Sequence, residues 1–207
     1  MQEVALIVIA KEPVPGRVKT RLTPPYTAQQ AAALAGAALQ DTLQTVASTP
    51  APRRVLVFEG DAARWCPDGF ELIPQRGEGL GARLQAAFDA VGGPSLLIGM
   101  DTPQLTPAQL LAGAAELAQE RTDAVLGPAV DGGYWCVGLR KPWPGVFENV
   151  PMSAADTYLR QQQRFTELGL RLGCQPLLRD VDTVADARAV AALAPRTRFA
   201  QALRATG

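Results

Sequence analysis

The sequence predicts an α/β protein, a three-layer α/β/α arrangement around a mostly parallel, mixed sheet. Short apolar runs rich in β-branched residues alternate with helical segments of about ten or more residues, the pattern of a parallel sheet covered by helices. Several runs are apolar at consecutive positions, as expected for strands buried on both faces. No linker, repeat or low-complexity tract interrupts the 207 residues, so we assign residues 1–207 to one domain.

The first half begins with the run VALIVIA, which predicts a strand over residues 4–10. After a loop from Lys11 to Pro25, Thr27 is a suitable N-cap for a long helix rich in Ala, Leu and Gln that reaches about residue 47. The same patterns then predict strands at 54–58 and 70–74, a helix at 80–91 and a strand at 95–99.

In the second half, Thr106 caps a helix that starts with Pro107 at its favoured first position and ends near residue 120. Ser153 is expected to cap a helix that ends near residue 168. Thr183, or alternatively Asp182, caps the helix after the last strand. The remaining elements are strands at 123–127, 135–139 and 172–178, a helix at 184–193 and a final helical segment.

The composition excludes several kinds of chemistry. The chain has no histidine, which removes Ser-His-Asp and Cys-His catalysis and the H-E-x-x-H zinc site. Lys and Arg together number 20, as do Asp and Glu, so the net charge gives no reason to expect a nucleic-acid partner. Any reaction must therefore use carboxylates, amines, guanidiniums, backbone N–H groups or a hard metal held by oxygen.

The cysteines and the apolar segments bear on the cellular compartment. The three cysteines are scattered without C-x-x-C spacing, which argues against a disulfide framework or a zinc site and fits a reducing cytosol. The N-terminus lacks the positive region of a signal peptide, and no apolar run is long enough to span a bilayer. We therefore expect a cytoplasmic protein without a membrane span.

A basic loop, residues 11–22 (KEPVPGRVKTRL), directly follows the first predicted strand. It carries four cations, and Gly16 allows its backbone to approach a ligand closely. Arginine grips phosphate oxygens in a bidentate manner, whereas lysine supplies a mobile point charge. The loop is neither a Walker P-loop nor a G-x-G-x-x-G fingerprint. Its place after the strand favours phosphate binding over a solvated basic turn, with Lys11, Arg17, Lys19 and Arg21 as the candidate side chains.

Carboxylates follow two other predicted strands. Asp101 ends the strand at 95–99, and Asp180 and Asp182 share one face of an extended segment after the strand at 172–178. Each could simply cap a helix or form an Asx-turn. Together they predict a hard-metal site, because Mg²⁺ with a nucleotide typically uses one or two carboxylates plus phosphate oxygens.

Two further segments have weaker signals. The segment 75–84 (QRGEGLGARL) has three alternating glycines, which suit a loop against a flat ring or a sugar, or a plain helix entry. The segment 127–135 (GPAVDGGYW) contains the Asp-Gly-Gly of a hairpin turn. Its Asp131 and aromatic pair would also suit a polar acceptor pocket.

Five blocks in order resemble the nucleotide-diphospho-sugar transferase (GT-A) superfamily. More narrowly, the blocks resemble bacterial glycosyltransferase-like proteins that are similar to 2-phospho-L-lactate guanylyltransferase and to molybdenum-cofactor nucleotidyltransferases. The resemblance spans nearly the whole chain and rests on PGRVKTRL (15–22), GEGLGARL (77–84), IGMDTPQL (98–105), GPAVDGGYWCVGL (127–139) and DVDT (180–183).

The resemblance implies a role for each block. The basic loop would wrap a triphosphate, and the glycine-rich loop would lie near the base. Asp101 would hold Mg²⁺ (or Mn²⁺) with Asp182 as second ligand, and Asp131 with Tyr134 would face the acceptor. Relatives usually carry a second acid near the first metal ligand, where this chain has Thr102 and Gln104. The implied nucleotide-binding residues are Lys11, Gly16, Arg17, Lys19, Arg21, Gln75, Gly79 and Gly81.

These expectations describe a transferase. The leading hypothesis is a Mg²⁺-dependent nucleotidyltransferase that passes NMP from an NTP to a small phosphorylated acceptor and releases pyrophosphate, with Lys19 and Arg21 stabilising the transition state. A glycosyltransferase that uses a nucleotide sugar and Asp131 as base is the alternative, and a catalytically silent nucleotide-binding module is the third. The acceptor, the base preference and the oligomeric state stay open, with a homodimer among the alternatives.

Overall fold

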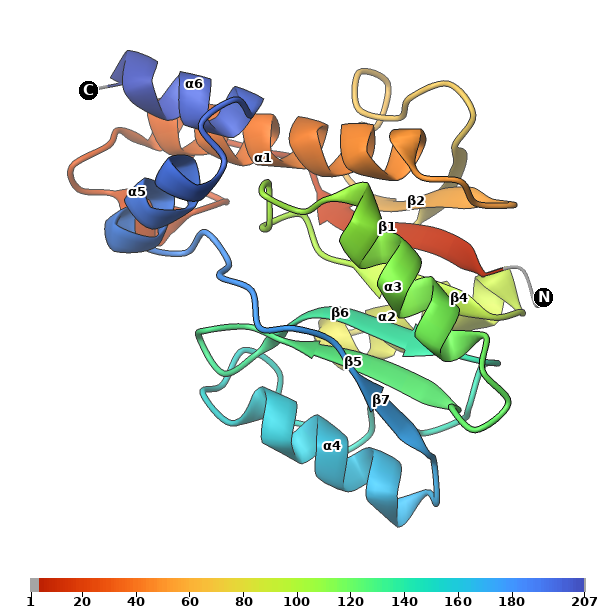
Figure 1. Cartoon of the computed structure of the whole chain (residues 1–207). Helices are drawn as coiled ribbons and strands as arrows, with labels where there is room; N and C mark the ends of the chain where they lie inside the picture. The colour runs from red at the N-terminus through yellow and green to blue at the C-terminus, as the bar shows by residue number, and fades with distance from the viewer. Residues whose placement is uncertain (1–3, 207) are drawn as a thin grey trace.

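A computed structural model describes residues 4–206 and contains a seven-stranded sheet with helices on both faces (Figure 1). The strand order is β3-β2-β1-β4-β6-β5-β7. Strand β6 is antiparallel to β4 and β5, and the other neighbouring pairs are parallel, so the predicted mixed sheet is confirmed. The strands are β1 (Ala5–Lys11), β2 (Arg54–Glu59), β3 (Glu71–Pro74), β4 (Ser95–Ile98), β5 (Ala124–Pro128), β6 (Tyr134–Leu139) and β7 (Leu172–Cys174).

Three of the predicted helix caps are confirmed, and each is a full capping box. The side chains of Thr27, Thr106 and Thr183 accept the N–H of the residue three positions later, whose side chain in turn accepts the cap N–H. The helices are α1 (Ala28–Ser48), α2 (Gly79–Val91), α3 (Pro107–Leu117), α4 (Thr157–Glu167), α5 (Val184–Leu193) and α6 (Arg198–Thr206), with a short 3₁₀ turn η1 (Thr20–Leu22) in the basic loop.

The expected cap at Ser153 was wrong, because α4 begins four residues later, at Thr157. The Thr157 hydroxyl contacts the Pro151 carbonyl at 2.8 Å and accepts the Ala154 N–H at 3.0 Å, which holds the intervening segment in turns. The last strand is also shorter than predicted. β7 ends at Cys174, and the Gln175 and Leu178 N–H groups continue the contact with β5 by donating to the Leu126 and Pro128 carbonyls at 2.9 and 3.0 Å.

Alternation along β1 divides the core into two layers. Leu6 and Val8 pack with α1 and α3 on one face of the sheet, whereas Ile7 packs with α2 and α4 on the other. Both faces are therefore covered, as the consecutive apolar positions predict.

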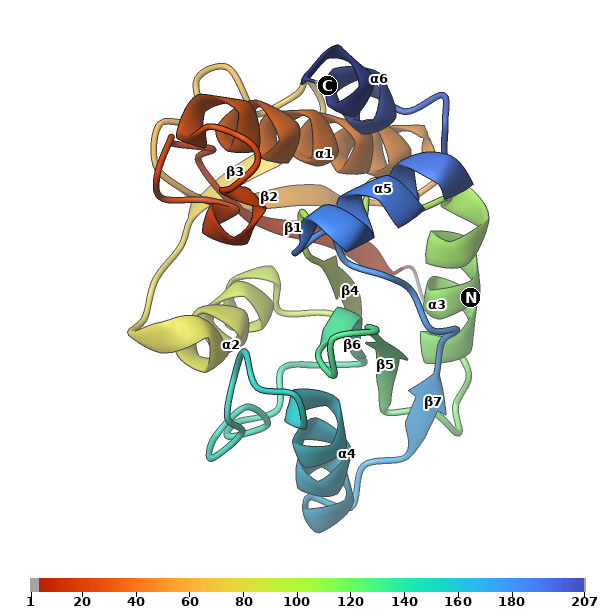
Figure 2. The same ribbon diagram turned by 90° about the vertical axis from the view of Figure 1, so that its left-hand side faces the viewer.

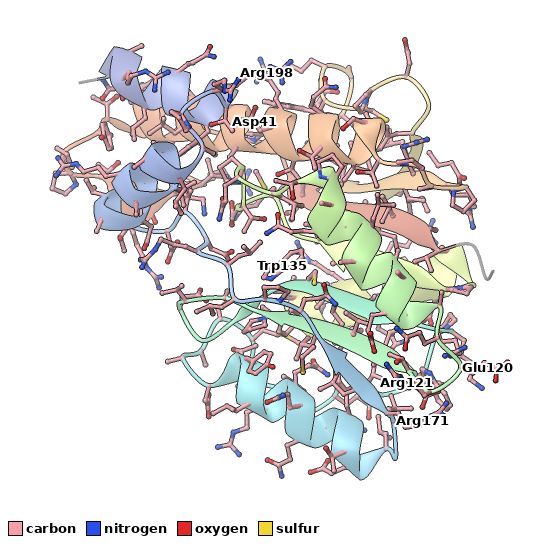
Figure 3. The ribbon with its side chains drawn as sticks, in the orientation of Figure 1. Asp41, Glu120, Arg121, Trp135, Arg171 and Arg198 are labelled. Atoms are coloured by element: carbon pink, nitrogen blue, oxygen red, sulfur yellow. The ribbon has the colours of Figure 1, made fainter. Side chains whose placement is uncertain are left out.

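Helix α6 packs against α1, and α5 packs against α6, around a third apolar cluster beside the sheet (Figure 2). Asp41 on α1 is buried and accepts the N–H groups of Arg198 and Phe199 at 3.0 and 2.8 Å, which caps α6 (Figure 3). The cluster also contains Leu22 from the basic loop and Val181 from the segment before α5. One small core therefore joins the two segments predicted to hold the ligand.

The topology brings two candidate segments together. Strand β1 lies between β2 and β4, so the chain leaves β1 toward one side of the sheet and later returns on the other. Such a switch point opens a crevice at the carboxyl ends of the strands, where Lys11 ends β1 and Asp101 follows β4. In residues 4–206, no helix combines the length and the apolarity that crossing a bilayer requires.

Candidate functional site

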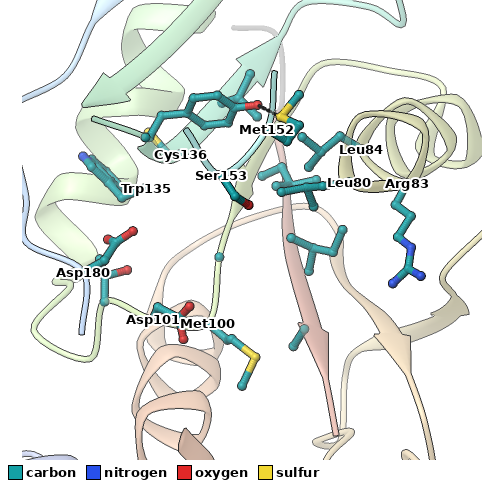
Figure 4. Close-up of a pocket in the computed structure, with 18 of the residues that line it drawn as sticks. Leu80, Arg83, Leu84, Met100, Asp101, Trp135, Cys136, Met152, Ser153 and Asp180 are labelled. Atoms are coloured by element: carbon teal, nitrogen blue, oxygen red, sulfur yellow. Dashed lines mark hydrogen bonds between the residues drawn. The ribbon is translucent and has the colours of Figure 1, made fainter. Parts of the chain in front are cut away.

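Two adjoining cavities open at the carboxyl ends of β1 and β4. We call the first, of about 440 Å³, the charged cavity, because the basic loop and several aspartates line it. The second, of about 420 Å³, is the apolar cavity, lined by side chains such as Leu84, Tyr134 and Trp135 (Figure 4). The residues common to both are Lys11, Met100, Asp101, Asp131, Ser153 and Asp180.

The basic loop presents all four of its cations to the charged cavity, as the sequence predicts. Lys19 precedes η1 with φ 48° and ψ 39°, a left-handed conformation that is uncommon for a residue with a side chain. The η1 turn buries Leu22 in the third cluster, which anchors the loop. An anchored loop with an unusual backbone at its central lysine is typical of a functional segment.

Lys19 reaches the carboxylate that follows β4. Its Nζ lies 2.9 Å from Asp101 Oδ1, and the lysine side chain is only 9% exposed. The contact is an ion pair by distance, although its geometry is not that of a hydrogen bond. Two residues singled out for separate reasons, phosphate and metal binding, are thus direct neighbours.

The segment before α5 lies against the same place. We call residues 179–183 the strap. The Val181 N–H donates to the Asp101 carbonyl at 2.9 Å, and Gln104 Nε2 donates to the Arg179 carbonyl at 2.7 Å. Val181 is buried in the third cluster, so its two acidic neighbours, Asp180 and Asp182, face away from that cluster toward the charged cavity.

The two acids of the strap differ in their partners. Asp182, the second metal ligand expected from the sequence, forms an ion pair with Arg21 and lines only the charged cavity. Asp180 lines both cavities on the side of Asp101 (Figure 4), and its Oδ1 is buried without a hydrogen-bond partner. Burial, together with the nearby Asp101 and Asp131 carboxylates, raises the pKa of Asp180 to about 7, against the opposing effect of Lys19.

This donor set fits a hard divalent cation bound together with a phosphate ligand. In the described part of the chain, no group of three or more Asp, Glu, Cys or His side chains is arranged to hold a metal by itself. Asp101 and Asp180 offer two carboxylates, and Mg²⁺ is commonly held by one or two carboxylates plus substrate phosphates. The buried Asp180 Oδ1 has no hydrogen-bond partner, as expected of an oxygen that binds a metal ion.

The position of Asp131 is compatible with both roles that the sequence left open, a turn residue and a residue that faces a polar pocket. Its Oδ1 accepts the Gly133 N–H at 2.9 Å, the bond of an Asx-turn, and its side chain also lines both cavities. The turn is held against the start of α4, because the Tyr158 N–H donates to the Gly132 carbonyl at 2.8 Å. Asp131 is therefore a turn residue that faces the site.

The far end of the apolar cavity carries a polar network. Gln75, which follows β3, donates from Nε2 to the Ala10 carbonyl at 2.7 Å and accepts from Arg83 at 3.2 Å. Arg83 also forms an ion pair with Glu59 at the end of β2. Gln75 thus lines the apolar cavity, in a network that the sequence did not indicate.

The described residues that line the two cavities do not include the glycines predicted to bind nucleotide, Gly16, Gly79 and Gly81. A Cβ on Gly81 would lie 3.2 Å from the Phe147 carbonyl oxygen, so this glycine faces a neighbouring segment. From the same stretch of chain, Leu80, Arg83 and Leu84 reach the apolar cavity.

Two lining residues had no functional prediction. Ser153, expected to be a cap, lines both cavities with φ 61° (Figure 4). Met152 accepts the Tyr134 hydroxyl at 3.6 Å, so the Tyr134 hydroxyl, whose pKa burial raises, already has a partner. No local pattern marks the segment 152–153, because the turns around Thr157 place it in the cavity.

The sequence profile of a family described as uncharacterized proteins conserved in bacteria (DUF2064) matches residues 29–154. The chain belongs to this family. The match includes Asp101 and Asp131 and leaves the basic loop and the strap outside it.

One solved structure resembles this DUF2064 chain over almost its entire length. It comes from Desulfovibrio desulfuricans G20, is provisionally named a nucleotide-diphospho-sugar transferase, and is 30% identical with a TM-score of 0.87. The alignment covers 99% of this chain and 95% of the other. No curated protein matches the sequence significantly.

More distant structures share the fold. A nucleotidyl transferase from Methanothermobacter is 16% identical, with a TM-score of 0.61 and coverage of 98% and 99% of the two chains. CMP:2-keto-3-deoxy-manno-octonic acid synthetase, solved with CTP, is 12% identical, with a TM-score of 0.59 and coverage of 94% and 99%. The DUF2064 chain therefore has the fold of nucleotide-diphospho-sugar transferases, the GT-A type predicted from the sequence.

Proposed function

We propose that the chain is a divalent-metal-dependent nucleotidyltransferase that transfers NMP from an NTP to a small phosphorylated acceptor and releases pyrophosphate. One observation carries the proposal: Lys19 of a four-cation loop contacts Asp101 beside the buried, unpartnered carboxylate of Asp180. The cations proposed to bind phosphate and the carboxylates proposed to bind the metal thus lie together at the edge of the sheet where α/β proteins bind ligands. The names of the structures with the same fold support this choice.

Each cavity would hold a different part of the substrate. The triphosphate would lie in the charged cavity, where Lys11, Arg17, Lys19 and Arg21 face it. The nucleoside would occupy the apolar cavity, with its base toward Gln75 and Arg83. The acceptor would approach from the side of Asp131 and Ser153, two of the residues that line both cavities.

Catalysis would consist of positioning and charge neutralisation. An ionised phosphate oxygen of the acceptor attacks the α-phosphorus in line, the new P–O bond forms, and the bond to the β-phosphate oxygen breaks to release pyrophosphate. No proton needs to be removed from such a nucleophile, which suits a chain without histidine. Lys19 and Arg21 would neutralise charge on the transferring and leaving phosphates. A bound Mg²⁺ or Mn²⁺, with Asp101 and Asp180 as its protein ligands, would supply Lewis-acid polarisation of phosphate oxygens.

A thermal-shift screen tests this function. ATP, GTP, CTP, UTP and several nucleotide sugars are each compared with and without Mg²⁺ or Mn²⁺, followed by an assay of pyrophosphate release. A ligand at 100 times its Kd stabilises the folded state by about 2.7 kcal/mol, which gives a readily measured shift in Tm. We expect a metal-dependent shift with at least one NTP, and its loss in Asp101→Asn.

The other outcomes are equally informative. A shift with nucleotide sugars alone would favour glycosyl transfer with Asp131 as base. A shift with NTP that Asp101→Asn and Asp180→Asn leave unchanged would favour a catalytically silent nucleotide-binding module. No shift with any nucleotide would reject the proposal. Asp156→Asn is the matched control, because Asp156, the residue before α4, pairs with the exposed Arg160 and lines neither cavity.

A further inference from the structure

A hydrogen bond from Gln104 ties the loop that carries Asp101 to the strap, and the proposed function gives this bond no role. Gln104 follows Asp101 by three residues, is half-buried and lines neither cavity. Its Nε2 donates to the Arg179 carbonyl at 2.7 Å, across 75 positions of the sequence. A carbonyl oxygen can only accept, so this contact requires the amide nitrogen of Gln104. The side chain therefore acts on the strap and not on the contents of the cavities.

The loop that carries Gln104 is firmly held. Leu105, the next residue in the chain, is buried in the core layer that contains Leu6. Its N–H donates to the Thr102 carbonyl at 3.0 Å, which closes a turn around Gln104. The glutamine side chain thus projects from a fixed support.

The strap, in contrast, carries carboxylates into a crowded place without regular structure of its own. Its residues 179–183 belong to no helix or strand in the described chain. Burial and the repulsion from Asp101 and Asp131 raise the pKa of Asp180, against the effect of Lys19. When it is ionised, the Asp180 carboxylate is therefore pushed away from Asp101, and the strap has to be held against this force.

Two hydrogen bonds hold the strap, one on each side of Asp180. The Val181 N–H donates to the Asp101 carbonyl at 2.9 Å, and Gln104 holds the carbonyl of Arg179. The first bond joins two backbones, so it does not depend on the identity of either side chain. The second depends on one side chain, that of Gln104. A substitution at this position can therefore change the spacing between Asp101 and the strap.

We propose that Gln104 is a positioning residue for the divalent cation: it holds the strap carboxylates within reach of the ion that Asp101 binds. The proposal rests on the proposed function. It applies to Asp180 and Asp182 alike, because both belong to the segment that Gln104 holds. A group that orients a metal ligand commonly contributes about 10- to 100-fold to metal affinity without touching the ion. Loss of the Gln104 bond should therefore weaken metal binding out of proportion to its effect on folding.

Calorimetric titration of the full chain with Mn²⁺, alone and with inorganic tripolyphosphate, tests this role. Gln104→Met keeps the length of the side chain and removes the donor, and we expect it to bind Mn²⁺ about tenfold more weakly. Thr45→Val is the matched control, because the Thr45 hydroxyl on α1 donates to the Leu105 carbonyl at 3.2 Å, a bond to the same loop that does not involve the strap. Thr45→Val should lower Tm in EDTA about as much as Gln104→Met does and leave the affinity for Mn²⁺ within about twofold.

A second variant, Gln104→Glu, separates positioning from direct contact with the ion. An ionised carboxylate has no donor for the Arg179 carbonyl, so a positioning role predicts the same loss of Mn²⁺ affinity at pH 8 as in Gln104→Met. Tighter Mn²⁺ binding by Gln104→Glu would mean that position 104 reaches the ion itself, and it would overturn the proposal. This variant also provides the test if Gln104→Met does not fold.

The remaining results separate this proposal from the proposed function. The positioning role is rejected if Gln104→Met binds Mn²⁺ as tightly as the unmodified protein, or if Thr45→Val loses as much affinity. In either case, binding by the unmodified protein leaves the proposed function in place. If the unmodified protein binds Mn²⁺ neither alone nor with tripolyphosphate, the proposed function fails, and the positioning role fails with it.

Discussion

Gly132 and the carbonyl oxygen of Ala155 are so close that a methyl group on Gly132 has no room. This contact joins the turn that carries Asp131 to the segment that carries Ser153, and both side chains line the two cavities. Gly132 also has φ 89°, which residues with a side chain rarely adopt. The shape of the cavities near Asp131 and Ser153 thus depends on one glycine.

We therefore expect Gly132→Ala to lower the free energy of unfolding by about 1–3 kcal/mol and to weaken transfer more than nucleotide binding. Chemical denaturation and a comparison of kcat with the nucleotide KM measure the two effects. Gly93→Ala is the matched control, since a Cβ there meets no atom within 4 Å and its backbone is not left-handed. Equal effects of the two substitutions would contradict this view of the turn.

Lys19 and Asp101 should each be essential for turnover. Lys19→Ala or Asp101→Asn should lower kcat by about 10²–10³, the usual effect of removing one preorganised electrostatic partner. Steady-state assays of pyrophosphate release measure the loss once a substrate is known. Lys141→Ala is the control, because Lys141 lies over the Trp143 ring, 4.1 Å from its centre, and lines neither cavity. Less than about a threefold loss at either position would remove that residue from the mechanism.

Because the pKa of Asp180 is raised, replacement of Asp180 by Asn should stabilise the protein at high pH and have little effect at low pH. A carboxyl whose pKa is raised to about 7 in the folded state is neutral below that pH, and it costs free energy when it ionises above it. In EDTA, Asp180→Asn should therefore unfold at a higher temperature than the unmodified protein at pH 8 and at nearly the same temperature at pH 5. A variant that is less stable at pH 8 would show that the charged form has a stabilising partner.

The contribution of Asp123 to stability should depend on pH in the opposite direction. It accepts bonds from Arg171 at 2.7 Å (Nε) and 2.9 Å (Nη2), and this pairing lowers the pKa of Asp123 to about 2. Its contribution is present above the ordinary pKa near 4 and is lost as the pH falls toward 2. Asp123→Asn should cost about 1 kcal/mol at pH 7, allowing for solvent screening at this surface pair, and much less near pH 2.

Urea denaturation at the two pH values measures the contribution of Asp123. The exposed pair of Asp156, the residue before α4, and Arg160 on α4 serves as the comparison. Asp156→Asn should change stability by no more than about 0.5 kcal/mol at either pH. A pH-independent effect of Asp123→Asn would mean that packing, and not ionisation, explains its contribution.

Local sequence patterns were enough for the sheet and most helices. Consecutive apolar residues in β1, the capping boxes at Thr27 and Thr106, and the proline at position 107 act within a few residues, so each can be recognised without knowledge of the fold. The start of α4 could not be found in this way. Ser153 is a good capping residue, but the hydrogen bonds of Thr157 to the Pro151 carbonyl and the Ala154 N–H determine where the helix begins.

The sequence indicated the individual residues of the site but not which of them contact one another. The positions of Lys19 and Asp101 follow from the strands that precede them, whereas their direct contact depends on the left-handed backbone at Lys19. The alternation of Asp180 and Asp182 is visible in the sequence. Their separation, one carboxylate buried near Asp101 and the other on Arg21, depends on the hydrogen bond from Val181 to Asp101, a long-range contact without a local signal.

The third apolar cluster has a consequence for how the protein can diversify. Leu22 and Val181 pack with helices outside the sheet, so the segments that we propose to bind the ligand are attached to a small appended core. Substitutions in that core can shift the spacing between Arg21 and the strap while the sheet, and with it the position of Asp101, stays fixed. Homologues could thus acquire new substrates by rebuilding one corner of the molecule, with the reaction centre inherited unchanged.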